Sequence, residues 1–325
     1  MHSPSDIAIS ICDLTKNFGQ RRALDHLTLS IKRGELFCLL GPNGGGKSTL
    51  FRILSTLIQP DHGEAKILGH DVTSDAAAVR ARIGVVFQAP SLDGKLTIHE
   101  NLLCGGALYG LRGKDLDQRL HDAATALQLE ERLKDRVETL SGGLQRRTEI
   151  AKCLLIRPEV LLLDEPSTGL DPAARLDLWA ALENLRRDRG VTAICTTHLM
   201  DEAARADRVG IMSAGQLVAL GTPTELTSAL GGDVLSLTTR HGADQLAQRI
   251  NQHHEIVATV VEGEVRIEHP QAYELAARLA AQFSDEITAI RVARPTLEDV
   301  FVARTGRLFG QQDAEPISAP LNLKT

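Results

Sequence analysis

A glycine-rich segment that ends in lysine and serine is the part of the sequence best suited to bind phosphate. Its residues are Gly41, Pro42, Asn43, Gly44, Gly45, Gly46, Lys47 and Ser48, which fit the spacing GxxxxGK[ST]. Glycines let successive backbone N–H groups face inward, and a helix that follows adds the positive end of its dipole. Lys47 would then reach the β- and γ-phosphates of a nucleotide, and Ser48 would ligate Mg²⁺. A glycine-rich turn before a helix is the ordinary alternative.

Two adjacent carboxylates supply the second half of this predicted site. Asp164 and Glu165 follow the apolar run Val160–Leu163. Because successive side chains of a strand point to opposite faces, we expect Asp164 to hold Mg²⁺ through water and Glu165 to polarise the attacking water. A strand that simply ends in an acidic turn is a common alternative. The glycine-rich segment upstream favours the catalytic interpretation.

The elements that must position these residues form an alternating pattern. From Ile7 to about Leu230, short apolar runs alternate with longer helical patterns, which predicts an α/β domain. Four runs are strand candidates: Leu36–Leu40, Ile83–Phe87, Val160–Leu163 and Val191–Thr196. The central ones are apolar on both faces, as buried parallel strands tend to be. The glycine-rich segment lies between the first of these and the helical run Thr49–Leu57, the context that phosphate binding requires. The helical stretch Thr97–Leu133 predicts a separate lobe.

A different pattern follows Gly231 and Gly232. Its strands and helices come in the order β-α-β-β-α-β: Asp233–Thr239, Ala243–Asn251, Glu255–Val261, Glu264–His269, Ala272–Phe283 and Ile287–Ala293. This order predicts a small α+β, ferredoxin-like domain, with Glu262 and Gly263 as a hairpin turn. We therefore expect a nucleotide-binding domain over residues 1–230, an accessory domain over 231–307 and a flexible tail over 308–325.

Composition excludes several classes of protein. The 325 residues are 43% hydrophobic and 24% charged, which is ordinary for a globular chain. The net charge of −6 provides no general basic surface for nucleic acid, so no nucleic-acid partner is expected. Five scattered cysteines without a CxxC pair indicate a reducing compartment and no metal cluster. No apolar run approaches the roughly 18 residues of a membrane-spanning helix, so any membrane role must come through a partner.

The segment Leu140-Ser141-Gly142-Gly143-Leu144-Gln145 narrows the choice among ATPases. It resembles the LSGGQ signature of the ATP-binding-cassette (ABC) superfamily. Ser141 suits a helix N-cap, and the glycines leave backbone N–H groups uncovered to meet a γ-phosphate. In that family the signature faces the glycine loop of a second cassette in a head-to-tail dimer. Seen in isolation, Ser-Gly-Gly could also be a routine helix start.

Other positions that match the family follow in order along the chain. Phe18 matches the aromatic residue that stacks on adenine, Gln88 the glutamine that senses Mg²⁺, and His198 the histidine that contacts the γ-phosphate. The segment Ser167–Asp171 matches the loop that crosses the dimer interface in that family. Each of these residues, taken singly, has an ordinary structural explanation. The resemblance depends on their occurring together and in the family's order.

The resemblance implies a P-loop NTPase cassette with a RecA-like core and a helical lobe, with ATP and Mg²⁺ as its cofactors. The implied catalytic residues are Glu165, His198 and Gln88, and the implied metal ligands are Ser48, Gln88 and Asp164. The implied ATP contacts are Phe18, Gly41, Pro42, Asn43, Gly44, Gly45, Gly46, Lys47, Ser48, Thr49, Ser141, Gly142, Gly143 and Asp171.

Two departures from the family pattern are visible. Gly45 stands where alanine is frequent, and Leu144 stands where the plain signature has glutamine, before Arg146-Arg147. Neither change removes a phosphate contact, so we still expect hydrolysis. The segments Phe87–Asp93 and Pro295–Phe301 resemble the daunorubicin-resistance type of exporter ATPase, whose permease is a separate membrane chain. This resemblance extends to about Arg307.

The resemblance implies an ATPase subunit that works as a pair at the cytoplasmic face of the membrane. ATP binding would close two copies and hydrolysis would reopen them, with permease helices in a groove beside Gln88 and against the lobe Thr97–Leu133. The C-terminal domain could assist dimerisation or coupling, or only stabilise the chain. A soluble cassette that acts on ribosomes or DNA is the alternative, although only one glycine loop and one signature occur. A non-hydrolysing regulator would lack Glu165 or His198. The transported compound, the permease and the choice between a homodimer and a mixed pair stay open.

Overall fold

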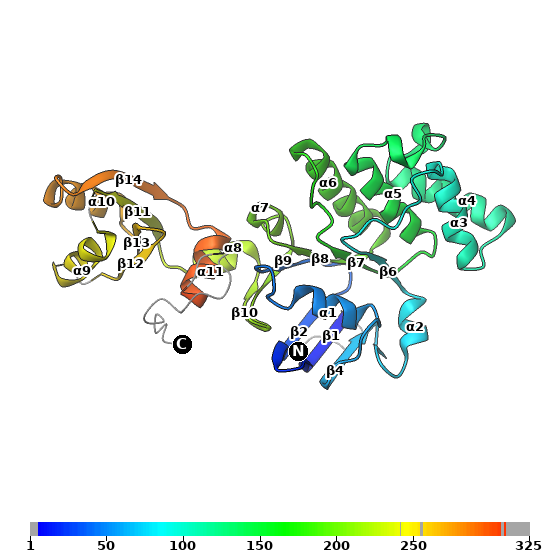
Figure 1. Cartoon of the computed structure of the whole chain (residues 1–325), viewed down its shortest axis with the longest axis horizontal. Coiled ribbons are helices and arrows are strands. Elements are labelled where there is room, and N and C mark those ends of the chain that lie inside the picture. Colours follow the sequence, from blue (N-terminus) through cyan, green and yellow to red (C-terminus); the bar gives the residue numbers. More distant parts are fainter. Residues whose placement is uncertain (1–5, 241, 254–255, 307–308, 310–325) are drawn as a thin grey trace. The chain divides into compact units, whose positions relative to one another are not determined.

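The computed structural model describes residues 6–240, 242–253, 256–306 and 309. The chain divides into two compact units. The first ends at Leu217 and the second starts at Val218 (Figure 1). The change of unit falls within strand β10 (Gln216–Gly221), earlier than the boundary expected at residue 230. Within the described ranges, no helix is long and apolar enough to cross a membrane.

A six-stranded sheet forms the centre of the first unit. Its strand order is β10-β9-β3-β8-β7-β6, and the pairs β9–β3, β3–β8, β8–β7 and β7–β6 are parallel. The strand bounds are Leu36–Leu40 for β3, Ile83–Val86 for β6, Val160–Asp164 for β7, Thr192–Thr197 for β8 and Arg208–Ser213 for β9. Because β3, β7 and β8 are buried along their whole length, they read as continuous apolar runs in the sequence. The predicted α/β class is confirmed.

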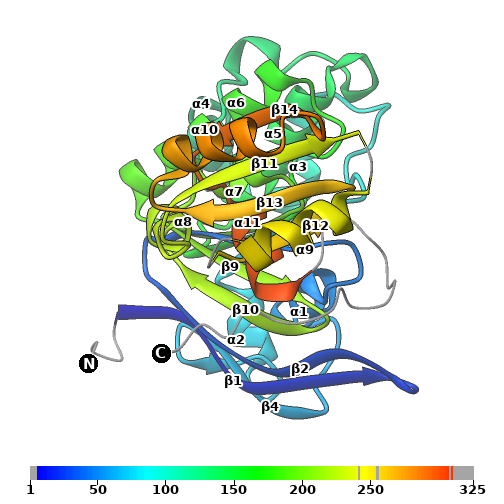
Figure 2. The same cartoon turned by 90° about the vertical axis from the view of Figure 1, so that its left-hand side faces the viewer.

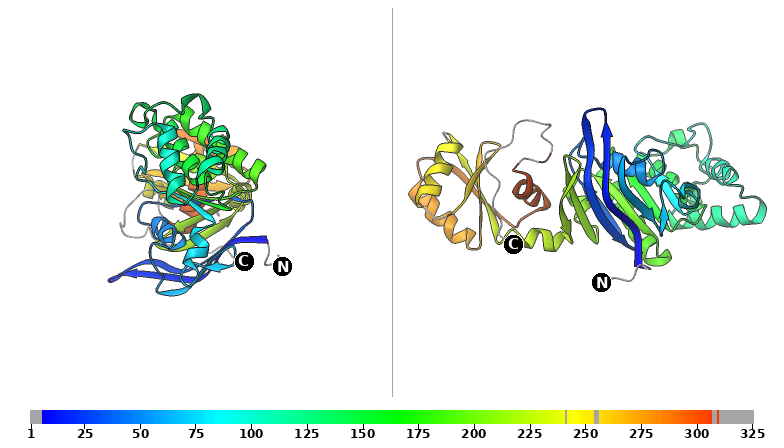
Figure 3. Two further views of the ribbon diagram at one scale, coloured as in Figure 1. Left: turned by 90° about the vertical axis from the view of Figure 1, so that its right-hand side faces the viewer. Right: turned by 90° about the horizontal axis from the view of Figure 1, so that it is seen from below.

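An antiparallel sheet that the sequence analysis did not separate accompanies the parallel one. Its order is β2-β1-β4-β5, with bounds Ile7–Phe18 for β1, Arg21–Lys32 for β2, His62–Ile67 for β4 and His70–Asp71 for β5. Strands β1 and β2, blue in Figure 3 (right), form a hairpin with Phe18 and Arg21 at its turn. Helix α1 (Lys47–Leu54) shares one hydrophobic core with both sheets, through fully buried Leu50 and Phe51. Each such side chain stabilises the fold by about 1.5–3 kcal/mol.

Helices make up a separate part of the first unit, as expected for the stretch Thr97–Leu133 (Figure 3, left). Helix α3 (Ile98–Leu108) begins with a capping box in which Thr97 and Glu100 each accept a backbone N–H of the other. Helix α4 (Gly113–Ala126) follows, and α5 (Gly142–Leu154) packs against both. Short 3₁₀ turns at Glu130–Arg132 and Val137–Thr139 lead into α5.

The other helices of the first unit are α2 (Ala76–Arg80), α6 (Pro172–Arg189) and α7 (Met200–Ala203). The ends of α6 are set by its sequence. Asp171 caps its first turn, Pro172 occupies the first helical position, and Gly190 ends it with φ at 65°.

The second unit contains a four-stranded antiparallel sheet of order β12-β13-β11-β14. The bounds are Asp233–Thr239 for β11, Ala258–Val261 for β12, Glu264–His269 for β13 and Ile287–Ala293 for β14. Helices α9 (Ala243–His253) and α10 (Ala272–Gln282) lie on one face of the sheet, on the near side in Figure 2. Their buried leucines pack on Leu235 and Leu237 of β11. The element order is the predicted β-α-β-β-α-β.

The predicted hairpin turn is confirmed. Glu262 and Gly263 join β12 to β13 with φ angles of 51° and 79°, the two positive values of a type I′ turn. Helices α8 (Pro223–Ser228) and α11 (Leu297–Thr305) complete the second unit. The predicted strand start at Glu255, the end of the accessory domain at Arg307 and, except for Phe309, the predicted tail lie outside the described residues.

Candidate functional site

The glycine-rich loop runs from the end of β3 into α1. Gly46 precedes α1 with φ at 103°, a value that side chains rarely tolerate. A Cβ atom at Gly46 would lie 2.6 Å from the carbonyl oxygen of Ala23, and one at Gly41 would lie 2.6 Å from that of Met212. Close approach of backbone on both sides therefore requires glycine at these positions.

Lys47 is the buried cation of the loop. Its side chain is 4% exposed, and Nζ donates to the carbonyl oxygens of Gly41 at 2.6 Å and Pro42 at 3.0 Å. Burial lowers the pKa of Lys47, and the nearby carboxylates of Glu165 and Asp164 oppose that effect. A positive charge held in this way is available to phosphate oxygens.

A cavity of about 540 Å³ opens beside the loop. The predicted residues that line it are Phe18, Asn43, Gly44, Gly46, Lys47, Ser48, Thr49, Gln88 and Glu165. Its volume is in the range of ligand pockets. Arg21, Ala23 and Arg52 also line it and were not predicted. Arg21 donates to the carbonyl oxygen of Gly44 at 3.2 Å, so the β1–β2 hairpin is tied directly to the loop.

Thr196 of β8 positions both carboxylates at the end of β7. Its hydroxyl donates to Oδ1 of Asp164 at 2.6 Å and accepts from the backbone N–H of Glu165 at 2.8 Å. Burial raises the pKa of Asp164, and the hydrogen bond from Thr196 opposes that rise. Sequence reasoning missed Thr196, although a hydroxyl inside a fully buried strand is a usable signal because it needs a partner.

Glu165 adopts a strained backbone conformation. Its φ of 46° lies in the left-handed region, which costs a residue with a side chain about 1–3 kcal/mol. Oε2 accepts from the hydroxyl of Thr168 at 3.1 Å. Nδ1 of His198 lies 3.4 Å from the same oxygen, outside hydrogen-bond geometry, and this buried nitrogen has no hydrogen-bond partner in the described part of the chain. The structure thus places close together two residues that the family resemblance assigns to one catalytic site.

Glu202 connects the segments that carry these two residues. It is 1% exposed and accepts from the hydroxyls of Ser167, just after Glu165, and of Thr197, just before His198. The Thr197 contact is 2.7 Å long. Sequence reasoning missed Glu202, because an acidic residue in Met200-Asp201-Glu202 resembles an ordinary exposed helix residue.

The signature residues and Asp171 lie away from this cavity. Among the described residues, the cavity lining includes none of Ser141, Gly142, Gly143 or Asp171. Ser141 caps α5 by accepting the N–H of Leu144 at 3.4 Å, and Asp171 caps α6 by accepting that of Ala174 at 2.9 Å. A Cβ at buried Gly143 would lie 2.7 Å from Cβ of Ala174, so packing also requires this glycine.

Comparison with known proteins identifies the family. The family model described as "ABC transporter" matches residues 24–168, which include the glycine loop, the signature and both carboxylates. The daunorubicin resistance ATP-binding protein DrrA3 of Streptomyces coeruleorubidus is 36% identical over 93% of this chain and 97% of its own length. This chain belongs to the ABC transporter family. It is an ATP-binding cassette that hydrolyses ATP.

Other ABC proteins extend the likeness. The Nod factor export ATP-binding protein I of Bradyrhizobium diazoefficiens is 37% identical over 93% of this chain and 98% of its own. The cassette MJ0796, solved as a dimer in a post-hydrolysis state with ADP and Pi, is 28% identical with a TM-score of 0.59. It covers 66% of this chain and 98% of its own. The cassette described here thus resembles proteins named for different cargoes along nearly its whole length.

Proposed function

We propose that this cassette is the ATPase subunit of an exporter whose permease is a separate membrane chain, at the cytoplasmic face of the membrane. An apolar groove of about 570 Å³ in the first unit carries the proposal. Leu108, Tyr109 and Leu57 line it while 88%, 62% and 61% exposed, and Phe87 brings the groove up to Gln88. Clustered exposed apolar residues mark interaction sites, and short permease helices fit this one. Two relatives, one named for daunorubicin resistance and one for Nod factor export, support the direction of transport.

The cavity residues take the roles expected from the sequence. Lys47 and the loop N–H groups bind the phosphates of ATP, Phe18 stacks on the adenine, and Glu165 accepts a proton from the attacking water. His198 and Gln88 orient the γ-phosphate and that water.

We further propose that oxygens of Ser48, Gln88 and Asp164 hold Mg²⁺, since this cation prefers oxygen ligands. When bound, Mg²⁺ neutralises charge that develops on the phosphates. Ser48 and Gln88 line one cavity, and Asp164 is a buried carboxylate that a cation would compensate.

The signature residues and Asp171 are proposed to act on the ATP of a second copy. Ser141, Gly142 and Asp171 are exposed. In the part of the chain that the structure describes, none of them lines the cavity beside the glycine loop of the same chain. A head-to-tail homodimer would use these surfaces, and the dimeric MJ0796 cassette supports such a pairing. We assign nucleotide binding to residues 1–230 and an accessory role in dimerisation or coupling to residues 231–307.

Affinity capture tests the proposed function. A tagged Glu165→Gln chain is purified from detergent-solubilised native membranes with ATP and Mg²⁺, and its partners are identified by mass spectrometry. We expect a multi-spanning protein in matching amounts, and a chain with Leu108 and Tyr109 replaced by serine should recover much less of it. Recovery of ribosomal proteins alone would reject the transport role.

A further inference from the structure

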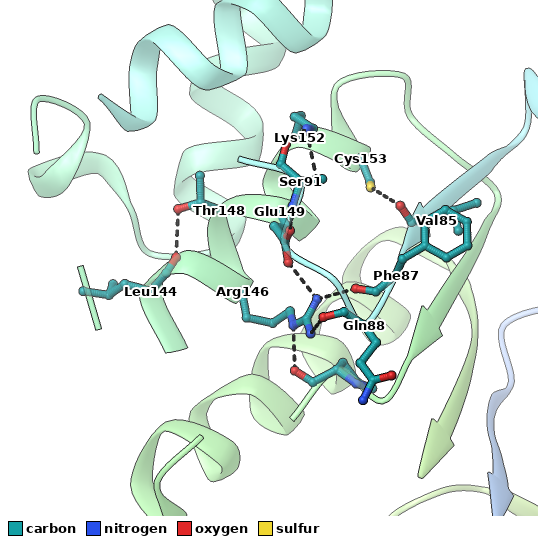
Figure 4. A network of polar contacts seen from close by, with 11 residues as sticks. Val85, Phe87, Gln88, Ser91, Leu144, Arg146, Thr148, Glu149, Lys152 and Cys153 are labelled. Carbon is teal, nitrogen blue, oxygen red and sulfur yellow. Dashed lines mark hydrogen bonds and ion pairs between the residues drawn. The ribbon is translucent and has the colours of Figure 1, made fainter. Parts of the chain in front are cut away.

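Arg146, in the first turns of α5, joins three segments of the nucleotide-binding unit (Figure 4). It is 8% exposed. Nε donates to the carbonyl oxygen of Pro166 at 2.9 Å, and Nη1 donates to that of Phe87 at 2.8 Å. Nη2 lies 3.4 Å from the carbonyl oxygen of Gln88. A single guanidinium therefore connects the signature helix to the backbone at Gln88 and to the residue after Glu165.

Glu149 completes the contact from the next turn of α5. It is 4% exposed, and Oε2 accepts from Nη1 of Arg146 at 2.7 Å. Oε1 accepts from the backbone N–H of Ser91 at 2.6 Å. The pair thus holds the segment Phe87–Ser91 at both of its ends, with Gln88 between them (Figure 4).

The same face of α5 reaches the apolar groove. Residues 146, 149, 152 and 153 share one side of the helix because they are three or four positions apart. Nζ of Lys152 donates to the carbonyl oxygen of Ser91 at 2.8 Å, and Sγ of Cys153 donates to that of Val85 at 3.4 Å. Lys152, Cys153, Val85 and Phe87 all line the groove. The face of α5 that holds the segment Phe87–Ser91 is therefore continuous with the lining of the groove.

The chemistry of the pair explains why arginine occupies this position. A buried ion pair offsets its desolvation only when its remaining donors are also satisfied. Arginine provides a rigid fork of donors for several carbonyl oxygens, whereas lysine provides a single ammonium. Lysine at position 146 could keep the charge near Glu149 and would lose the contacts that diverge to Phe87 and Pro166.

We propose that Arg146 and Glu149 are positioning residues that hold Gln88 in register with Glu165. The proposal rests on the proposed roles of Gln88 and Glu165. Neither member of the pair lines the ATP cavity as the structure describes it, so they act through the backbone of Phe87–Ser91 and of Pro166.

Turnover of the purified full chain carrying Arg146→Lys provides the test. We expect kcat to fall about 10- to 100-fold, the effect of a displacement near 1 Å in an active site. ATP affinity should stay close to wild type, and half-maximal turnover should need more Mg²⁺. The thermal midpoint should fall by only a few degrees, because two buried carbonyl oxygens lose a donor. The matched control is Arg147→Lys, because Arg147 contacts Gln128 and Asp177 instead. Equal kcat and equal Mg²⁺ dependence in the two variants would overturn the proposal.

Two further variants separate a positioning role from general damage. Adding Arg146→Lys to Gln88→Ala should slow turnover little beyond Gln88→Ala alone, and a full multiplicative loss would refute action through Gln88. If Arg146→Lys does not fold, Glu149→Gln must give the same kcat and Mg²⁺ effects, and unchanged values would refute the pair. The proposed function fails by a different result, which is undiminished turnover in Glu165→Gln.

Discussion

Two ion pairs with a buried carboxylate, one in each unit of the chain, are alike in charge and differ in the groups that they contact. Nη1 of Arg146 lies 2.7 Å from Oε2 of Glu149, and Nη2 of Arg266 lies 3.0 Å from Oδ1 of Asp299. The first arginine also donates to the backbone on both sides of the nucleotide site. The second carboxylate accepts from the N–H and hydroxyl of Thr296, which start helix α11.

The second pair is also less completely satisfied. Nη1 of Arg266 is buried and has no hydrogen-bond partner among the residues that the structure describes. Burial and the nearby charge of Asp299 raise the pKa of Glu268. A buried charged group therefore indicates a functional role only where its other hydrogen bonds are to segments that carry catalytic residues. In the first unit we expect substitutions of such groups to change turnover, and in the second to change stability.

The largest effect should follow from Lys47→Ala. This change removes the charge-assisted hydrogen bonds to phosphate, so ATP should bind about 100-fold more weakly or worse. Isothermal titration measures the change, with Lys66→Ala, an exposed lysine of the same unit, as the control. Unchanged affinity in Lys47→Ala would mean that the phosphate site lies elsewhere.

Thr196→Val should reduce turnover and leave ATP affinity nearly unchanged. It removes the hydrogen bonds to Asp164 and to the N–H of Glu165, and leaving such buried groups unpaired costs about 1–3 kcal/mol. If that cost falls on the arrangement of the transition state, kcat drops about 10- to 100-fold. Steady-state phosphate release measures the change in kcat. A loss of thermal stability with normal kcat would mean that Thr196 has only a structural role, as we expect for the charged groups of the second unit.

Asp299→Asn should weaken the fold of the second unit and leave turnover unchanged. The substitution removes the charge of the buried carboxylate and disturbs the capping box, with an expected cost of about 1–3 kcal/mol. Denaturant unfolding measures the loss. A fall in kcat without any loss of stability would erase the contrast between the two pairs.

The smallest effect is expected for Glu268→Gln. A carboxyl group whose pKa is raised by folding penalises the folded state above its unfolded pKa, and the penalty disappears as pH falls below that value. Glutamine should therefore raise the thermal midpoint slightly at pH 7 and lose this advantage near pH 4, close to the ordinary pKa of about 4.3 for glutamate. A stabilisation that persists at pH 4 would assign the effect to another cause.

Local spacing was enough to predict where the glycine-rich segment and the two carboxylates lie in the fold. The segment Gly41–Ser48 comes directly after β3, and Asp164 and Glu165 lie at the end of β7. These positions depend only on neighbouring residues in the sequence. The contacts of Glu202 and Arg146 could not be predicted, because they join segments far apart in the chain. Thr196 was missed although a hydroxyl in a buried strand indicates that it has a hydrogen-bond partner. The antiparallel sheet was missed for a related reason, since β1 pairs with β4 across a long stretch of sequence.

In the second unit the pattern of elements was sufficient. Alternating apolar residues in short strands fixed the faces of the sheet, and Glu262-Gly263 fixed the turn between its middle strands in the chain. The structural role of the segment Pro295–Phe301 could not be predicted from the sequence. The structure resolves it into a helix start at Thr296 with Asp299 paired to Arg266, and such a pairing depends on the tertiary fold.

Glu165 is proposed to be the base of an ATP-hydrolysing cassette. Single-turnover and steady-state assays of Glu165→Gln test this role. This variant should bind ATP as the wild type does and retain it uncleaved, with steady-state phosphate release reduced about 100-fold or more. Phosphate release at the wild-type rate would contradict this role and require a different base in the cavity.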